Sequence, residues 1–134
     1  IGVVFVGGEG ESPYAQHEDQ LLRERTLDFC GRTSISELIG LLKLGDVFIG
    51  NDSGPMHLAA LVGLPVVAVH SARDYPGKWQ PYGTGHKVLR RQVDCEGCGL
   101  DVCVKEGLKC LYSIGVREVV LAAMEQMDKA RFDQ

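Results

Sequence analysis

Residues 46–70, DVFIGNDSGPMHLAALVGLPVVAVH, contain two apolar runs separated by a short polar break and a helical segment. The pattern predicts a strand over 46–50, a helix over 55–63 and a second strand over 65–70. In a strand-helix-strand unit of this kind the two strands run parallel, and their connection is right-handed. The stretch therefore predicts a parallel sheet with a crossover helix.

The polar break, NDSGP at 51–55, lies where the chain leaves the first strand and enters the helix. Gly54 permits a close approach of the backbone, and Pro55 suits the start of a helix because its missing N–H is not needed there. Asp52 or Ser53 can cap the helix. A carboxylate beside a diphosphate would repel it, so we expect Asp52 to cap, to orient the loop or to hold a sugar hydroxyl.

The first turn of this helix is a candidate anion site. The N–H groups of Met56 and His57 are expected to point outward at the positive end of the helix dipole, which favours phosphate oxygens. The imidazole of His57 can add a hydrogen bond or a charge. An ordinary capped helix without a ligand has the same pattern, so the local chemistry indicates no more than a site suited to a phosphate-bearing ligand.

Strand and helix patterns continue to alternate outside this stretch. Segment 32–45 has apolar residues at a period of about 3.6, with Ser34 and Glu37 as a capping box and Gly45 at its end. Such alternation is typical of an α/β fold with a parallel sheet, helices on both faces and ligands at the carboxyl ends of the strands. The other predicted elements are strands over 1–7, 27–30 and 86–91, helices over 11–25 and 116–131, and loops over 71–85 and 94–110.

Several of these segments carry expectations about burial. The β-branched and aromatic run at 1–7 predicts a buried strand, and Cys30 in strand 27–30 is expected to be a core residue. In loop 71–85, Trp79 is expected to anchor the loop against the core, with stacking on a base or sugar as the alternative; Tyr82 has the same two readings. The apolar side of the last helix is expected to hold Val116, Val119, Val120, Ala123, Met124 and Met127.

The composition is that of an ordinary globular protein and excludes several classes of function. The chain has 134 residues and a net charge of −4, which argues against nucleic acid as the main partner. The basic cluster HKVLRR at 86–91 is typical of a solvated strand edge. No apolar run has the length that spans a bilayer, and no secretory leader is recognisable, so we expect a cytoplasmic protein.

The order of the motifs resembles the donor-binding half of the family 9 glycosyltransferases, which include the lipopolysaccharide heptosyltransferases. The motifs are VVFVGGEGE at 3–11, GRTSISEL at 31–38, NDSGPMHLAA at 51–60, WQPYG at 79–83 and CEGC at 95–98. The resemblance extends from residue 1 to about residue 130, and the DSGPMHLAA motif is its most specific part.

The resemblance implies a two-domain GT-B enzyme, in which residues 1–134 form a single Rossmann-like, nucleotide-sugar-binding domain in the carboxyl-terminal half. The implied donor is an ADP-sugar such as ADP-heptose, and the implied reaction is an inverting transfer in lipopolysaccharide core or related glycan synthesis, with no required cofactor. The general base and the glycolipid acceptor belong to the amino-terminal domain, so we expect no catalytic residue here and no activity from this part alone. Membrane association would be at most peripheral, at the inner face of the cytoplasmic membrane.

The resemblance also implies which residues bind the donor. Asp52, Ser53 and Gly54 would lie at the diphosphate, with Ser53 in place of the commoner threonine. Glu11 would hold the ribose hydroxyls, or else be an acid favoured by a helix dipole. Arg32 would border the adenine, or else be a solvated surface cation. The full implied set is Glu11, Arg32, Thr33, Asp52, Ser53, Gly54, Pro55, Met56 and His57.

Four cysteines fall in loop 94–110, at Cys95, Cys98, Cys103 and Cys110. The first pair has the spacing of metal ligands, but the later spacing is not that of two paired knuckles. The four are therefore candidate ligands of a structural Zn²⁺ or Fe–S cluster, or thiols in a loop that is fastened to the sheet.

Two other functions fit parts of the sequence. One is a non-catalytic module that binds a nucleotide or a sugar phosphate, and the other is a sugar-nucleotide 2-epimerase-like domain of similar fold. The DSGPMH motif and the cysteine segment favour the transferase.

Overall fold

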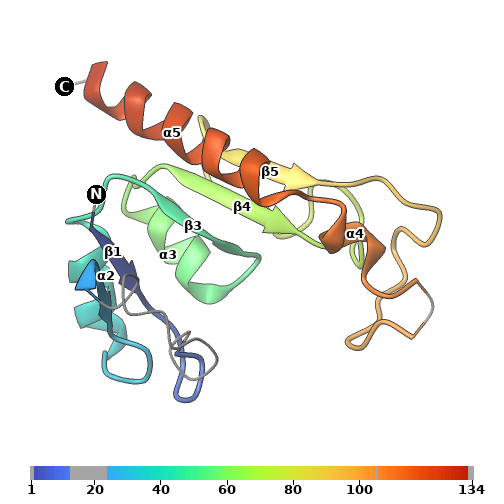
Figure 1. Cartoon of the computed structure of the whole chain (residues 1–134), viewed down its shortest axis with the longest axis horizontal. Helices are drawn as coiled ribbons and strands as arrows, with labels where there is room; N and C mark the ends of the chain where they lie inside the picture. The colour runs from blue at the N-terminus through green and yellow to red at the C-terminus, as the bar shows by residue number, and fades with distance from the viewer. Residues whose placement is uncertain (1, 13–23, 105, 133–134) are drawn as a thin grey trace. The chain divides into compact units, whose positions relative to one another are not determined.

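Strands β3 (Phe48–Asn51), β4 (Val66–His70) and β5 (Lys87–Arg90) form a parallel sheet in the order β3-β4-β5 (Figure 1). The computed structural model describes residues 2–12, 24–104 and 106–132. The chain forms two compact units, residues 1–41 and 42–134, and this sheet belongs to the second.

The predicted strand-helix-strand unit is confirmed. Helix α3 (Gly54–Leu61) connects β3 to β4, and the two strands pair in parallel with Asn51 opposite Val69. Strand β5 pairs with the other side of β4, with His70 opposite Arg90. Each element begins or ends within two residues of its predicted position.

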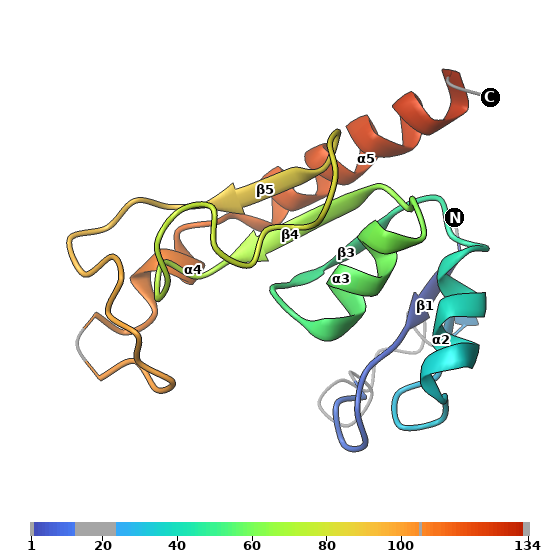
Figure 2. The same cartoon turned by 180° about the vertical axis from the view of Figure 1, so that it is seen from behind.

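The core of the second unit lies on both faces of the central strand β4. Val67 packs against Ala122 and Ala123 of helix α5 (Val116–Phe132). Side chains alternate along a strand, so the buried Val66 points to the opposite face, where α3 lies. Figures 1 and 2 show α3 and α5 on opposite sides of the sheet, so the prediction of helices on both faces is correct.

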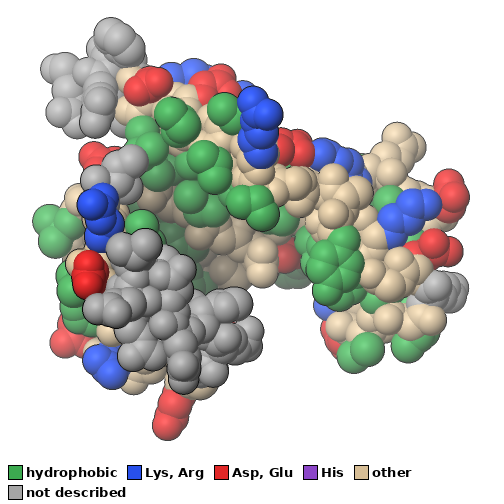
Figure 3. Space-filling model, viewed as in Figure 1, with side chains coloured by type: hydrophobic (Ala, Val, Ile, Leu, Met, Phe, Trp, Pro, Cys, Tyr) green, Lys and Arg blue, Asp and Glu red, His purple; other side chains and the backbone are tan. Residues whose placement is uncertain are grey.

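The predicted apolar side of α5 is only partly correct. Its buried residues are Ala122, Ala123 and Gln126, whereas Val116 is 80% and Met124 is 52% exposed. Small side chains let the helix approach β4 closely, and Gln126 is tolerated because its amide nitrogen donates to the Gly85 carbonyl at 2.7 Å. Hydrophobic side chains consequently gather on the outer side of α5 (Figure 3), and the exposed ones are Val116, Val120, Leu121 and Met124.

The first unit contains a second, two-stranded parallel sheet and most of one helix. Strands β1 (Val3–Phe5) and β2 (Thr26–Asp28) pair in parallel, and α2 (Ile35–Leu42) follows. The capping box is confirmed, because the Ser34 N–H donates to the Glu37 carboxylate at 2.8 Å and the Glu37 N–H to the Ser34 hydroxyl at 3.3 Å. Most of the predicted helix over 11–25 lies outside the described residues.

Two expectations about burial in the first unit are wrong. Val3 and Val4 of β1 are 41% and 47% exposed, and Leu27 of β2 is 60% exposed. Cys30 lies beyond the end of β2 and is only partly buried. The β-branched composition gave the strand and its parallel pairing correctly, but a sheet of two strands leaves much of each strand without a neighbour.

The segments after β4 are mostly irregular. The structure adds one short helix that was not predicted, α4 (Lys109–Tyr112), at the end of the cysteine-bearing loop. No helix among the described residues is both long and apolar enough to cross a lipid bilayer.

Candidate functional site

The candidate site lies at the carboxyl edge of the β3-β4-β5 sheet, where parallel sheets commonly bind ligands. His70 is opposite Arg90, and Asn51 is opposite Val69. Asp52, the next residue after Asn51, is therefore level with His70. The sheet thus brings the Asp52 carboxylate just after β3, the His70 imidazole at the end of β4 and the Arg90 guanidinium at the end of β5 to the same edge.

The NDSGP segment (51–55) turns the chain sharply from β3 into α3. Ser53 is the N-cap residue with an extended backbone, φ −131° and ψ 167°, and its N–H donates to the Asn51 carbonyl at 2.9 Å. The first helical hydrogen bond runs from the His57 N–H to the Ser53 carbonyl at 3.2 Å. The expectation that the His57 N–H points outward to a ligand is therefore wrong, because the helix itself uses this group. Pro55 lies in the first turn, as predicted.

The predicted side-chain cap is absent. Within the described residues, the Ser53 hydroxyl makes no capping hydrogen bond, although Ser53 holds the N-cap position. The N–H groups of Gly54 and Met56 precede the first helical bond, and groups in this position have no partner inside a helix. An uncapped first turn of this kind can donate to an anion.

Gly54 and Met56 fill different parts of this turn. A Cβ built on Gly54 would meet no atom of the described residues within 4 Å, so the fold itself does not require glycine there. Met56 is completely buried beneath the turn, backbone included, whereas Gly54 is exposed. His57 is half-buried. The outer side of the turn therefore carries no side chain at Gly54, and the inner side is filled by Met56.

His70 is a polar group at this edge that the sequence interpretation missed. Its side chain is only 3% exposed, and its Nε2 has no hydrogen-bond partner among the described residues. Burial lowers the pKa of His70, and this effect outweighs the nearby Asp52 carboxylate, which raises the pKa. The only sequence signal was a single polar residue closing the apolar run PVVAVH.

Arg90, at the end of β5, already has partners. Its guanidinium donates to the Glu96 carboxylate at 2.5 Å and to the Asp74 carbonyl at 2.8 Å. Asp74 and Glu96 lie in the two loops that follow β4 and β5. Arg90 therefore holds these loops at the carboxyl edge.

In the first unit, the loops after β1 and β2 hold the other predicted residues. The Glu11 carboxylate accepts from the Gly8 N–H at 2.5 Å, and the Gly31 N–H donates to the Gly7 carbonyl at 2.9 Å. These bonds bring Glu11 and the exposed Arg32 onto neighbouring loops. Thr33 follows Arg32 and is half-buried.

A small cluster beside these loops was also missed. The Ser12 hydroxyl and the Cys30 N–H donate to the Asp28 carboxylate, the latter at 3.0 Å. The Ser12 bond is the main reason that the pKa of Asp28 lies below its ordinary value. Burial, together with Asp28, raises the pKa of Cys30 to about 11, so its thiol is protonated at neutral pH.

The four cysteines of loop 94–110 line one small cavity of about 130 Å³. No disulfide joins any of the five cysteines, all of which are described. Among the described residues, no three Cys, His, Asp or Glu side chains are arranged to hold a metal ion. Backbone bonds fasten the loop, from the Gly97 N–H to the Ala72 carbonyl and from the Gly99 N–H to the Arg73 carbonyl, both at 2.8 Å.

The aromatic side chains of loop 71–85 are exposed rather than buried. Trp79 is 54% and Tyr82 is 78% exposed, so the expectation that they anchor the loop is wrong. The ammonium group of Lys78 lies 5.4 Å from the centre of the Trp79 ring, which is within the range of a cation–π contact.

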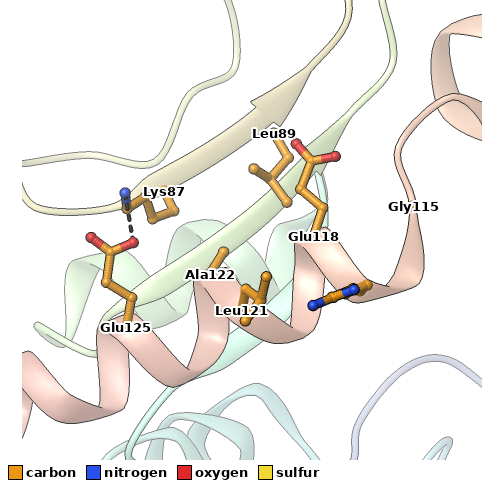
Figure 4. A pocket seen from close by; sticks show the side chains of 8 residues that line it. Lys87, Leu89, Gly115, Glu118, Leu121, Ala122 and Glu125 are labelled. Carbon is orange, nitrogen blue, oxygen red and sulfur yellow. Dashed lines mark ion pairs between the residues drawn. The ribbon is translucent and has the colours of Figure 1, made fainter.

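A larger, open hollow of about 540 Å³ lies between β5 and α5 (Figure 4). The Lys87 ammonium crosses it to the Glu125 carboxylate at 2.9 Å, and Leu121 and Ala122 line its floor. All its lining residues come from β5, α5 and the turn before α5. Its lining includes two cations, Lys87 and Arg117, and two carboxylates, Glu118 and Glu125, so this hollow is a poorer place for a phosphate than the first turn of α3.

The chain is similar to known proteins in sequence and in structure. A family model described as glycosyltransferase family 9 (heptosyltransferase) matches residues 1–109. Lipooligosaccharide heptosyltransferase 2 of Campylobacter jejuni subsp. jejuni serotype O:2 is 27% identical over 123 residues, which cover 88% of this chain and 38% of that protein. The protein of the same name from Haemophilus influenzae is 32% identical over 72 residues, 51% of this chain and 21% of that one. The chain thus spans less than half the length of these relatives.

A solved structure is also similar. The crystal structure of the glycosyl transferase family 9 protein from Veillonella parvula DSM 2008 matches 96% of this chain and 37% of its own, with a TM-score of 0.67 and 24% sequence identity. Together with the family match, this likeness confirms the predicted α/β, Rossmann-like fold of a GT-B glycosyltransferase.

Proposed function

The chain belongs to glycosyltransferase family 9, and on this premise we propose that it binds the diphosphate of a nucleotide-sugar donor at the start of α3. The donor is an ADP-sugar, with ADP-heptose as the first choice. The chain corresponds to the carboxyl-terminal, donor-binding half of a GT-B enzyme.

The uncapped first turn of α3 carries this proposal. It lies at the carboxyl edge of a parallel sheet, its early N–H groups are not taken by the Ser53 side chain, and Gly54 leaves its outer surface open. Phosphate oxygens suit such a position because both the N–H groups and the helix dipole favour negative charge.

The same turn would help the chemical step. As the bond between sugar and phosphate breaks, negative charge grows on the departing ADP. Helix-terminal N–H groups that are already in position stabilise that charge without reorganising. This role requires no catalytic side chain from the chain itself.

For the first unit, the family resemblance supplies the proposed contacts. Glu11 would bind the ribose hydroxyls, since a carboxylate can accept from both hydroxyls of a vicinal diol. Arg32 and Thr33 would border the adenine. In the structure one oxygen of the Glu11 carboxylate accepts from the Gly8 N–H, and a carboxylate can accept several hydrogen bonds.

The activity of the whole protein follows from the same proposal. We infer an inverting glycosyltransferase of lipopolysaccharide core or related glycan synthesis, with a glycolipid acceptor bound by a further domain. It would act in the cytoplasm, at most peripherally at the inner face of the membrane, and would need no cofactor for transfer. The 134-residue chain on its own is expected to bind the donor without transferring sugar.

Replacing Gly54 by valine tests the site. The added side chain would occupy the outer surface of the turn, so we expect the affinity for ADP to fall at least tenfold. Gly40→Val is the matched control, because Gly40 also lies in a helix with open space around its Cβ position. Both variants should change the stability of their helix by a similar small amount, because valine and glycine differ little in helix propensity.

Isothermal titration of the wild type and of both variants with ADP and UDP gives the readout. Equal ADP affinity in wild type and Gly54→Val would contradict the site. A wild type that prefers UDP would contradict the ADP-sugar donor and favour the epimerase-like alternative.

A further inference from the structure

We propose that His70 is a donor-contacting residue, with its Nε2 hydrogen-bonded to the diphosphate of the bound nucleotide sugar. This inference rests on the proposed function, because it adds a side chain to the same site. It assigns a role to a residue for which the family resemblance supplied none.

The position of His70 is the first argument. The strand register places it level with Asp52, directly beside the turn that leads into α3. It is the last residue of the central strand, and ligands of parallel sheets bind beyond such ends. A diphosphate on the first turn of α3 would thus lie over the end of β4.

The unpaired nitrogen is the second argument. His70 is only 3% exposed, and its Nε2 has no hydrogen-bond partner among the described residues. A buried polar atom without a partner is costly, and native proteins rarely retain one without a ligand or a water to satisfy it. A phenylalanine would fill similar space without that cost.

The groups that face His70 make its neutral form the relevant one. Asp52 after β3, His57 on α3 and Arg90 on β5 are its charged or titratable neighbours. Arg90 is held by Glu96 and Asp74, so it is not needed to balance His70. A neutral imidazole protonated on Nε2 can donate one hydrogen bond to a phosphate oxygen, and it avoids placing a further charge beside Arg90.

Replacing His70 by phenylalanine separates binding from structure. We expect the dissociation constant for ADP to rise about 5–10-fold, as for the loss of one hydrogen bond, while the melting temperature rises because a buried unpaired nitrogen is gone. A residue with a merely structural role would change the melting temperature and leave the affinity unchanged.

His86→Phe is the matched control. His86 already has partners, since its Nδ1 accepts from the Val66 N–H at 3.2 Å and its Nε2 lies 2.9 Å from the Tyr82 carbonyl. This variant should therefore lose stability and keep the ADP affinity of the wild type.

Imidazole nitrogen resonances of the unmodified chain provide a second readout that does not depend on how a variant folds. On addition of ADP or of inorganic pyrophosphate, the Nε2 resonance of His70 should shift, and that of His86 should not. One outcome overturns this inference and leaves the proposed function standing. In that outcome the wild type binds ADP and Gly54→Val binds it more weakly, but the His70 resonance does not shift and His70→Phe binds ADP as the wild type does. A wild type that binds neither probe contradicts both.

Discussion

At the end of β4, the buried imidazole of His70 has neighbours of both charges, Asp52 on one side and Arg90 on the other. Burial dominates and lowers its pKa below the ordinary value of 6.5. At the scale of single residues, this one group makes the stability of the fold depend on pH in a direction that can be worked out.

Because the folded chain keeps His70 neutral, the stability of the fold should decrease as the pH falls below about 6.5. Below that pH the unfolded chain binds a proton that the folded chain resists, so unfolding becomes easier. Urea unfolding at pH 7.5 and 5.5 measures the loss. The loss should be smaller in His70→Phe than in the wild type, and the same loss in both would show that another group is responsible.

Other features of single residues depend on contacts between segments that are far apart in the sequence, and the sequence pattern does not predict these contacts. The Ser12 and Asp28 pair, and the protonated Cys30 beside it, depend on two loops meeting. The exposure of Trp79 depends on where a long loop runs. No periodicity reports such contacts.

At the scale of elements, α2 illustrates what local sequence determines. Ser34 and Glu37 satisfy each other's N–H groups in the structure, as the spacing predicted. The helix begins directly after the cap and ends at Leu42, short of the predicted 45, where the Gly45 N–H donates back to the Leu42 carbonyl at 3.2 Å.

Replacing Ser34 by alanine should lower the free energy of unfolding by about 1 kcal/mol, since the Glu37 N–H in the first turn of α2 loses its acceptor. Ser36→Ala is the control, because Ser36 is exposed on the same helix beyond the cap. Urea denaturation of both variants checks the difference. Equal effects of the two substitutions would mean that the capping box contributes nothing measurable.

Helix α3 shows where local sequence was insufficient. Its strand-to-helix turn, its proline and its N-cap position were predicted, but the Ser53 hydroxyl does not cap it. The Ser53 N–H donates to the Asn51 carbonyl, but this bond leaves the N–H groups of the first helical turn without a side-chain cap. That difference strengthens the case for a ligand, because a capped turn would have fewer donors to offer.

At the scale of the whole molecule, alternating strands and helices were enough to predict the α/β class, the parallel pairing and the helices on both faces of the larger sheet. The buried side of α5 was misjudged at Val116 and Met124, because hydrophobicity alone does not say which side chains reach β4. Surfaces that stay exposed here include the outer side of α5, seen in Figure 3.

The candidate site was predicted mainly from the resemblance of its motif to a known family, and less from the physical properties of its residues. The sequence supported a phosphate-compatible turn, and the family resemblance turned this into a donor site with named residues. His70 escaped because its significance lies in burial and in an unpaired nitrogen, which only a structure reveals.

The most direct measurement is a crystal structure of the chain grown with ADP. The diphosphate should lie against the first turn of α3, within hydrogen-bond distance of the Gly54 N–H group and of the His70 Nε2. Density for ADP at any other place, with only solvent over this turn, would contradict the account.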